Sequence, residues 1–174
     1  KLLGLSECSP TPLRRAVSIH PIAAMEMEHS LFCLDIEKND ILNTCRELGI
    51  SITAYAPIGR GVLSGSFRSQ SDIPENDLRR FLPKYSEENF PKIMKLVDRL
   101  ESMAKEKDAT AAQIALAWLL SQGGDVVPIP GTKSPARMEE NLKATNVALK
   151  EEEIKELRTL AENMDILGTR YPQA

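Results

Sequence analysis

The stretch VPIPGTKSPARMEEN, residues 127–141, runs from an apolar strand through a short turn directly into a charged helix. The apolar run 126–129 has strand length, and Pro130-Gly131-Thr132 ends it. Ser134-Pro135 is typical of an N-cap followed by the first residue of a helix. The stretch therefore predicts one unit in which a strand feeds directly into a helix.

The turn and the first helical residues of this stretch carry the groups of an anion site. A helix N-terminus attracts phosphate through its free N–H groups and its macrodipole. Lys133 and Arg137 add two cations there, and Glu140 and Asn141 follow Arg137 by three and four residues on the same helix face. The alternative is a surface ion pair between Arg137 and Glu140 on an ordinary capped helix.

The same unit recurs along the chain. Strands are expected at 2–6, 22–28, 51–56 and 126–129, and helices at 12–19, 37–48, 89–105, from 111, from 135 and at 151–162. Alternating strands and helices imply parallel strands joined by right-handed crossovers. An open doubly wound sheet and part of a (β/α)8 barrel both satisfy this pattern. No G-x-G-x-x-G follows the first strand, which counts against a nucleotide-binding open sheet.

Composition limits the class of protein. Hydrophobic residues make up 42% and charged residues 27% of the 174, typical of one soluble globular domain. The net charge of -3 argues against a nucleic-acid-binding surface, and no apolar stretch is long enough to cross a membrane. Cys8, Cys33 and Cys45 are scattered, which predicts buried thiols, a reducing cytoplasmic location and no zinc site.

Two further strand ends carry polar residues. Ser6 and Glu7 close the first strand, where they could bind a polar ligand or serve only as a helix-capping loop. Glu26 and Glu28 lie on one face of the second strand, close to His29. Acid–base chemistry is open to such a group, but with a single nearby His we expect no metal site.

The third strand ends at Tyr55 and continues as APIGRGVLSG, residues 56–65. The Tyr55 ring offers a flat apolar face, the glycines permit close backbone approach to a ligand, and Arg60 supplies a cation for phosphate. A glycine-rich surface turn is the alternative. The loop extends to about residue 86, a length that is usually functional or flexible.

In order along the chain, these segments resemble the aldo-keto reductase family, in the branch that carries Gly-Leu-Ser-Glu and Ile-Pro-Gly-Thr. The likeness covers nearly the whole chain. It is carried by GLSE (4–7), HPI (20–22), CRELGI (45–50), residues 55–65, QIALAW (113–118), IPGTK (129–133) and Glu140-Asn141. No one motif is specific, but the ordered series is.

The resemblance implies a (β/α)8 barrel, of which residues 1–174 supply the C-terminal four units as half of a single domain. It also implies NADP(H) bound across the C-terminal ends of the strands. Tyr55 would stack on the nicotinamide, and Ser6 and Glu26 would bind its carboxamide. The residues implied along the pyrophosphate are Ala56, Pro57, Ile58, Gly59, Arg60, Leu63 and Gly65. Those implied at the 2′-phosphate and adenine are Gly131, Thr132, Lys133, Arg137, Glu140 and Asn141.

Three positions depart from the family pattern. Glu26 stands where the family has Gln, His29 where it has Tyr, and Glu7 where other branches have Asn. An ionised carboxylate can only accept hydrogen bonds, so Glu26 could accept from the carboxamide NH2 but could not donate to the carboxamide oxygen.

The catalytic Tyr, Asp, Lys and His of the family lie on its first four units, so no catalytic residue is assigned to this chain. Tyr55, Tyr85 and Tyr171 do not match the family's proton donor, and His20 is expected to be a strand-entry residue. Two function classes follow. One is the cofactor-binding half of a reductase acting on a small carbonyl substrate, completed by an N-terminal half-barrel. The other is a catalytically silent nucleotide-binding or assembly module that self-associates through its open strand edges. An unrelated open α/β sheet is a third reading.

Overall fold

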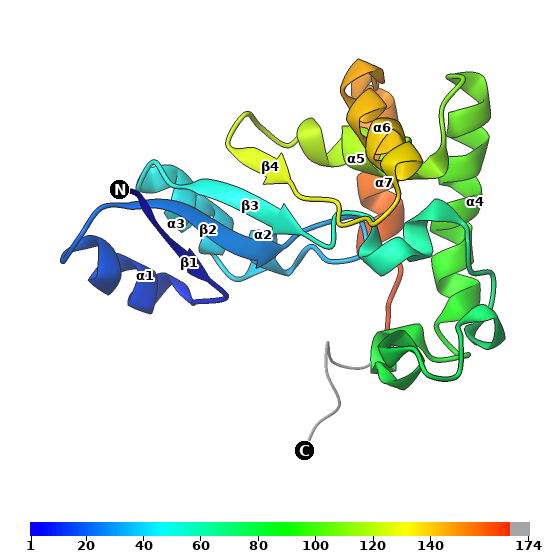
Figure 1. Cartoon of the computed structure of the whole chain (residues 1–174), viewed down its shortest axis with the longest axis horizontal. Helices are drawn as coiled ribbons and strands as arrows, with labels where there is room; N and C mark the ends of the chain where they lie inside the picture. Colours follow the sequence, from blue (N-terminus) through cyan, green and yellow to red (C-terminus); the bar gives the residue numbers. More distant parts are fainter. Residues whose placement is uncertain (168–174) are drawn as a thin grey trace.

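Four parallel strands form the centre of the computed structural model, which describes residues 1–167 (Figure 1). They are β1 (Leu3–Ser6), β2 (Ile22–Glu28), β3 (Ser51–Tyr55) and β4 (Val126–Pro128). Their order in the sheet is β1-β2-β3-β4, so each strand pairs with the next one along the chain. This order is that of a singly wound barrel wall, because a doubly wound sheet would reverse direction at a switch point.

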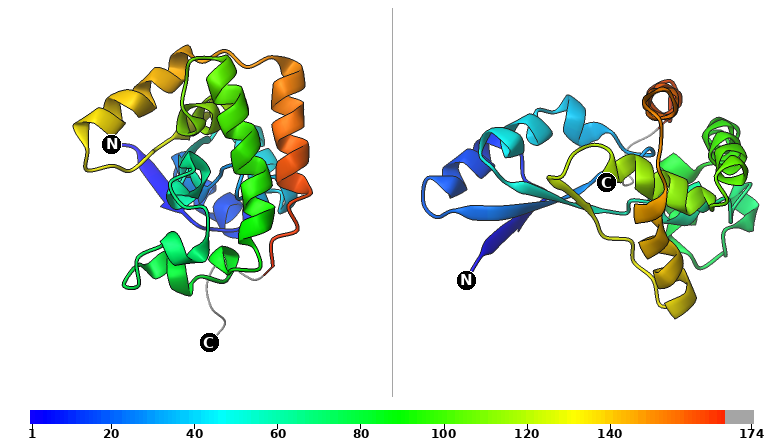
Figure 2. Two further views of the ribbon diagram at one scale, coloured as in Figure 1. Left: turned by 90° about the vertical axis from the view of Figure 1, so that its right-hand side faces the viewer. Right: turned by 90° about the horizontal axis from the view of Figure 1, so that it is seen from above.

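Helices connect the strands; those that follow β1 and β2 lie along one side of the sheet, and those that follow β3 and β4 gather beyond the C-terminal ends of the strands (Figures 1 and 2). The α-helices are α1 (Pro10–Val17), α2 (Asp35–Lys38), α3 (Ile41–Glu47), α4 (Phe90–Glu106), α5 (Ala111–Leu120), α6 (Pro135–Lys143) and α7 (Glu151–Glu162). The 3₁₀ helices are η1 (Gly59–Ser64), η2 (Gln70–Asp72), η3 (Leu78–Phe81), η4 (Pro83–Tyr85) and η5 (Ala144–Asn146).

Alternation along each strand separates two faces of the sheet. Met25 and Met27 of β2, with Ile52 and Ala54 of β3, are buried on the helix side and join the hydrophobic core. On the other face, the paired residues Ser6, Glu26 and Thr53 form a row across three strands. Of this row, Ser6 and Glu26 are exposed and Thr53 is partly buried. One face therefore stabilises the fold, and the other offers polar groups.

The expected strands and caps are confirmed with small shifts at their ends. The helix expected from residue 111 is α5, which the Thr110 side chain caps in a capping box with Gln113. Ser134 caps α6 with Pro135 in its first turn, as expected. Gly49 follows α3 with φ of +67°, the left-handed conformation expected after a helix C-terminus.

Two helix predictions were wrong in detail. The first helix begins at Pro10 after the N-cap Ser9, two residues earlier than the start at residue 12 that the sequence predicts. The helix expected over 37–48 is two helices, α2 and α3, separated by Asp40 at φ +64°. Ile41, Leu42 and Cys45 form a buried apolar stripe that belongs to α3 alone.

The long connection after β3 is ordered by polar anchors rather than by regular structure. Arg79 donates to the carbonyl of Arg60 at 2.6 Å and forms an ion pair with Asp77. The Tyr85 hydroxyl donates to the carbonyl of Gly59 at 3.1 Å. These contacts fold the connection back on its own beginning at the C-terminal edge of the sheet. Within residues 1–167, no helix combines the length and the apolar character needed to cross a membrane.

Candidate functional site

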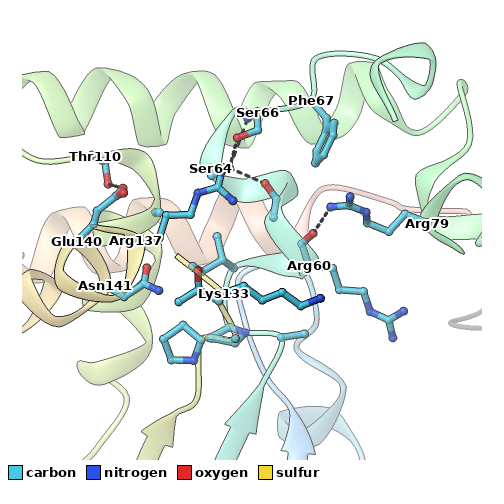
Figure 3. Close-up of a pocket in the computed structure, with 18 residues that line it drawn as sticks. Arg60, Ser64, Ser66, Phe67, Arg79, Thr110, Lys133, Arg137, Glu140 and Asn141 are labelled. Carbon is cyan, nitrogen blue, oxygen red and sulfur yellow. Dashed lines mark hydrogen bonds between the residues drawn. The ribbon is translucent and has the colours of Figure 1, made fainter. Parts of the chain in front are cut away.

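A cleft of about 990 Å³ lies at the C-terminal ends of β3 and β4 (Figure 3). Its walls are the connection after β3, the start of α5, and the turn between β4 and α6. The residues that line it are Ala56, Pro57, Ile58, Arg60, Gly61, Ser64, Ser66, Phe67, Arg79, Thr110, Ala112, Pro130, Gly131, Thr132, Lys133, Arg137, Glu140 and Asn141. The two segments that the sequence singled out, 55–65 and 127–141, therefore face each other across one cavity.

The positive end of the cleft is the N-terminus of α6. Ser134 caps the helix by accepting from the backbone N–H of Arg137, and the Thr132 hydroxyl accepts from the Ser134 N–H at 3.1 Å. These bonds fix the turn that carries Lys133. Figure 3 shows Lys133 and Arg137 extending from the α6 side toward the connection after β3. Two cations and a helix N-terminus together make a site for a multiply charged anion.

The contacts of Glu140 bear on the two interpretations of this helix, an anion site and a surface ion pair between Arg137 and Glu140. Glu140 accepts a hydrogen bond from the Thr110 hydroxyl at 2.7 Å, and its backbone carbonyl accepts one from Gln113. Among the ion pairs of residues 1–167, none joins Arg137 to Glu140. Arg137 is thus not committed to the surface pair considered from the sequence, while Glu140 and Asn141 line the same cavity.

The opposite wall includes residues that sequence reasoning did not select. Arg79 stacks over the Phe67 ring at 4.4 Å and is anchored to the Arg60 carbonyl. The Ser64 hydroxyl donates to the carbonyl of Gly61 at 2.7 Å, and because its one hydrogen is used there, it accepts from the Ser66 hydroxyl at 2.8 Å. For Arg79 and Phe67, the only sequence signal is a basic and an aromatic residue within a long connection. Ser64 and Ser66 carry no such signal.

Backbone conformation explains the glycines of this wall. Gly61 has φ of +96° and lies against Arg79, and Arg60 beside it has φ of +52°. Gly65 has φ of +77°, and a Cβ there would collide with the Glu101 carboxylate. A tight, left-handed path with little room for side chains is what glycine permits.

Three of the expected pyrophosphate residues lie behind the cavity surface. Leu63 is fully buried and belongs to the hydrophobic core, and Gly59 is buried beneath Tyr85. Gly65 packs near Val97 and Glu101 of α4. Any contact from Leu63 to a ligand in the cleft would come from its backbone.

The strand ends beside the cleft hold the remaining expected residues. Ser6 pairs with Glu26 across β1 and β2, and Glu28 pairs with Tyr55 across β2 and β3. The Tyr55 hydroxyl donates to Glu7 Oε1 at 2.6 Å, a bond that connects β3 to the end of β1. Glu7 has φ of +54°, and its N–H donates to the Glu26 carbonyl. Tyr55 thus has a fixed ring immediately before Ala56, where the cavity begins.

His29 belongs to a buried structural network, not to a metal centre. Its Nε2 lies 2.8 Å from Glu37 Oε1, and Glu37 also accepts from Arg158 of α7. Burial alone would raise the pKa of Glu37, but the hydrogen bonds from His29 and Arg158 lower it below its usual value. No group of three or more His, Cys, Asp or Glu in residues 1–167 is placed to hold a metal ion.

Cys33, Cys45 and Tyr85 are buried side chains, whereas Cys8, which was also expected to be buried, is only half-buried. Burial raises the pKa of Cys33 and of Cys45 to about 11, so both are protonated at neutral pH. Burial also raises the pKa of Tyr85, whose hydroxyl bonds to Gly59. His20 lies just before β2, at the end of the strand away from the cleft, as expected. Tyr171 lies outside the described residues.

Comparison with known proteins agrees with this geometry. The sequence profile of the aldo/keto reductase family matches residues 1–162. The chain belongs to the aldo/keto reductase family. It is 49% identical over 172 residues to aldo-keto reductase str7 of Strobilurus tenacellus, covering 98% of this chain and 51% of that protein. It is 45% identical over 174 residues to aldo-keto reductase yakc [NADP(+)] of Schizosaccharomyces pombe, covering 99% of this chain and 51% of that protein.

Solved structures place this aldo/keto reductase chain in the barrel. The glycerol dehydrogenase AKR11B4 from Gluconobacter oxydans superimposes with a TM-score of 0.86 at 27% identity, covering 97% of this chain and 51% of that one. The four strand–helix units are therefore half of a (β/α)8 barrel, as predicted. The chain spans about half the length of the curated relatives it matches.

Proposed function

We propose that this chain is the NADP(H)-binding part of a cytoplasmic aldo/keto reductase that converts a small aldehyde or ketone to an alcohol. The observation that carries the proposal is the placement of Lys133 and Arg137 at the N-terminus of α6, inside the cleft and across from the connection after β3. The relative yakc, whose name carries NADP(+), retains 45% identity over the whole chain.

The donors in the cleft fit this cofactor by chemistry. A 2′-phosphate carries two negative charges near neutral pH, and two cations with a helix N-terminus would bind it by charge-assisted hydrogen bonds. Arg60 and the backbone of residues 56–61 would hold the pyrophosphate. Glu140 and Asn141 would receive the adenosine, and Tyr55, with Ser6 and Glu26, the nicotinamide. The absence of the 2′-phosphate from NADH predicts a strong preference for NADPH.

The chemical step needs a hydride and a proton. When bound, NADPH supplies the hydride to the carbonyl carbon, and an acid must protonate the carbonyl oxygen. The described tyrosines do not offer that acid: Tyr85 is buried, and the Tyr55 hydroxyl donates to Glu7. We propose that residues 1–174 orient the cofactor and that the proton donor lies on the first half of the barrel.

The experiment is a fluorescence titration of the 174-residue chain with NADPH and with NADH, followed by an NADPH-oxidation assay on an aromatic aldehyde. We expect binding of NADPH, much weaker binding of NADH, and no turnover by a chain of verified mass. Turnover would contradict the assignment of the proton donor to another segment. Equal affinity for both dinucleotides would contradict the cofactor site.

A catalytically silent binding or assembly module is the second candidate. It is favoured by the polar face of the sheet that the described helices leave uncovered, with Ser6 and Glu26 exposed. This second candidate predicts the same binding of NADPH and NADH. It also predicts that the longest natural product of the gene reduces no aldehyde, which the NADPH-oxidation assay on that product tests.

A further inference from the structure

The start of α5 forms one wall of the cleft, and Thr110 lines the cleft there. Thr110 is the N-cap of α5, and its hydroxyl oxygen accepts from the backbone N–H of Gln113 at 3.3 Å. In return, the Gln113 side chain accepts from the Thr110 N–H at 2.9 Å. Because the Gln113 N–H points at a lone pair of the hydroxyl, the single hydrogen of that hydroxyl is left to donate elsewhere.

This hydrogen is donated to the carboxylate of Glu140 on α6. Thr110 Oγ1 lies 2.7 Å from Glu140 Oε1, and Gln113 Nε2 donates to the Glu140 backbone carbonyl at 2.8 Å. The capping box of α5 therefore holds both the side chain and the main chain of Glu140. Figure 3 shows Thr110, Glu140 and Asn141 together on one side of the cavity.

One oxygen of Glu140 remains for a ligand. Within residues 1–167, the second oxygen, Oε2, has no hydrogen-bond partner. Because Glu140 lines the cleft, Oε2 is the oxygen that it offers there. Without the Thr110 hydroxyl, the carboxylate could instead turn to Arg137, which lies three residues earlier on the same helix face.

A carboxylate held in this way distinguishes purine bases by the group at C6, because it accepts hydrogen bonds and cannot donate them. Adenine presents an amino donor at C6 beside a ring nitrogen that accepts, whereas guanine and hypoxanthine present an oxygen at C6. Glu140 Oε2 can accept from the amino group, and the Asn141 amide, which also lines the cleft, can donate to the ring nitrogen. An oxygen at C6 would face the negative carboxylate with no hydrogen between them.

We propose that Thr110 is a positioning residue that makes the cleft selective for a dinucleotide with a 6-aminopurine base. Its hydrogen bond fixes the Glu140 carboxylate with Oε2 toward the base, so the selectivity depends on α5 as well as on α6. This inference rests on the proposed function and deepens it, because it specifies how the base of the cofactor is recognised.

The experiment compares NADPH with its hypoxanthine analogue, in which an oxygen replaces the amino group at C6 and the phosphates are unchanged. Dissociation constants are measured by fluorescence titration of the 174-residue chain. We expect the unmodified chain to bind NADPH about tenfold more tightly than the analogue, as one hydrogen bond to a charged group predicts. Thr110→Val, which has the same shape but no hydroxyl, should bring this ratio close to one. Thr110→Ser, which keeps the hydroxyl, should retain the preference.

Thr110 also caps α5, so a further variant separates capping from positioning. Thr110→Asp supplies an acceptor for the cap but no hydrogen for Glu140, which its charge repels. We expect this variant to remain folded in thermal unfolding and to lose the preference for NADPH over the analogue. Lys133→Ala is the matched control on the opposite side of the base, and it should weaken NADPH and the analogue by the same factor.

Two results would overturn the role of Thr110. One is a ratio near one in the unmodified chain, and the other is a tenfold ratio that persists in both Thr110→Val and Thr110→Asp. Either result leaves the proposed function intact as long as NADPH binds more tightly than NADH. Failure of the unmodified chain to bind NADPH would overturn both proposals.

Discussion

The end of the cleft at the start of α6, where we propose that phosphate binds, and the strand ends beside the cleft are built in different ways. At the phosphate end, cations extend from a turn and a helix N-terminus, and the capping bonds of Thr132 and Ser134 fix the backbone rather than the charged groups. At the strand end, sheet register sets each residue, and the Glu7 bond fixes the Tyr55 ring itself. In the proposed cofactor site, the first region would supply affinity through charge and the second would supply position.

The walls of the cleft pack on α5, so truncation of the buried ring of that helix should give the largest loss of stability. Helix α5 packs against η1 on one side and β4 and α6 on the other, and its Trp118 is fully buried. Trp118→Ala is expected to lower the free energy of unfolding by about 3–5 kcal/mol because it leaves a large cavity. Urea denaturation measures this loss, and Trp118→Phe, which keeps a ring, should lose less. Equal losses from both variants would mean that the ring does not support the core.

Loosening the wall formed by the connection after β3 should weaken binding in the cleft and leave the strand ends beside it unchanged. Arg79→Ala removes the bond to the Arg60 carbonyl and the ion pair with Asp77, which is expected to cost about 2 kcal/mol of stability. Binding of NADPH and NADP⁺ should fall together, as calorimetry would record. Arg80→Ala, which removes one bond to the Ile73 carbonyl, is the matched control and should do less. A loss of stability no greater than that of Arg80→Ala would contradict the anchoring role of Arg79.

Removing the cap of α6 should give a smaller effect. Ser134→Ala deletes the side chain that accepts from the Arg137 N–H, and loss of an N-cap typically costs about 1 kcal/mol. Thermal unfolding measures the loss, and Ser134→Asp, which restores a cap, is the control. The prediction fails if the alanine and aspartate variants unfold alike.

The smallest effect depends on pH. The hydrogen bond from Arg79 lowers the pKa of Asp77 below its usual value. Stability from such a group is complete above the unfolded pKa of about 3.9 and is lost as pH falls through the lower folded value. Asp77→Asn should therefore lower the Tm at neutral pH, and its difference from the unmodified chain should vanish in strong acid. A difference in Tm that persists in strong acid would mean that the ionised Asp77 carboxylate is not the cause of the stabilisation.

How much of this could be predicted from the sequence differs between the two ends. The strand ends were predictable, because parallel strands bring Ser6, Glu26 and Tyr55 to one edge whatever the helices do. The α6 cap was predictable because Ser134-Pro135 carries a local signal. Both depend on residues adjacent in sequence or on a repeating topology.

The other features of the site depend on contacts between residues that are far apart in the sequence, and no local sequence pattern signals such contacts. Arg79 lies 19 residues from its partner Arg60, inside a connection with no periodicity. Glu140 bonds to Thr110, thirty residues away, and not to the nearby Arg137. Asp40 breaks the predicted helix by adopting a left-handed conformation that its residue type permits but does not require. Such features follow from tertiary packing and become visible only in the folded chain.

The most direct test of the central claim is the ratio of NADH to NADPH dissociation constants for the unmodified chain and for Lys133→Ala/Arg137→Ala. We expect the double variant to weaken NADPH by about 100-fold and NADH by far less, so the ratio collapses. Equal weakening of the two dinucleotides would show that these cations do not bind a 2′-phosphate and would contradict the NADP(H) site.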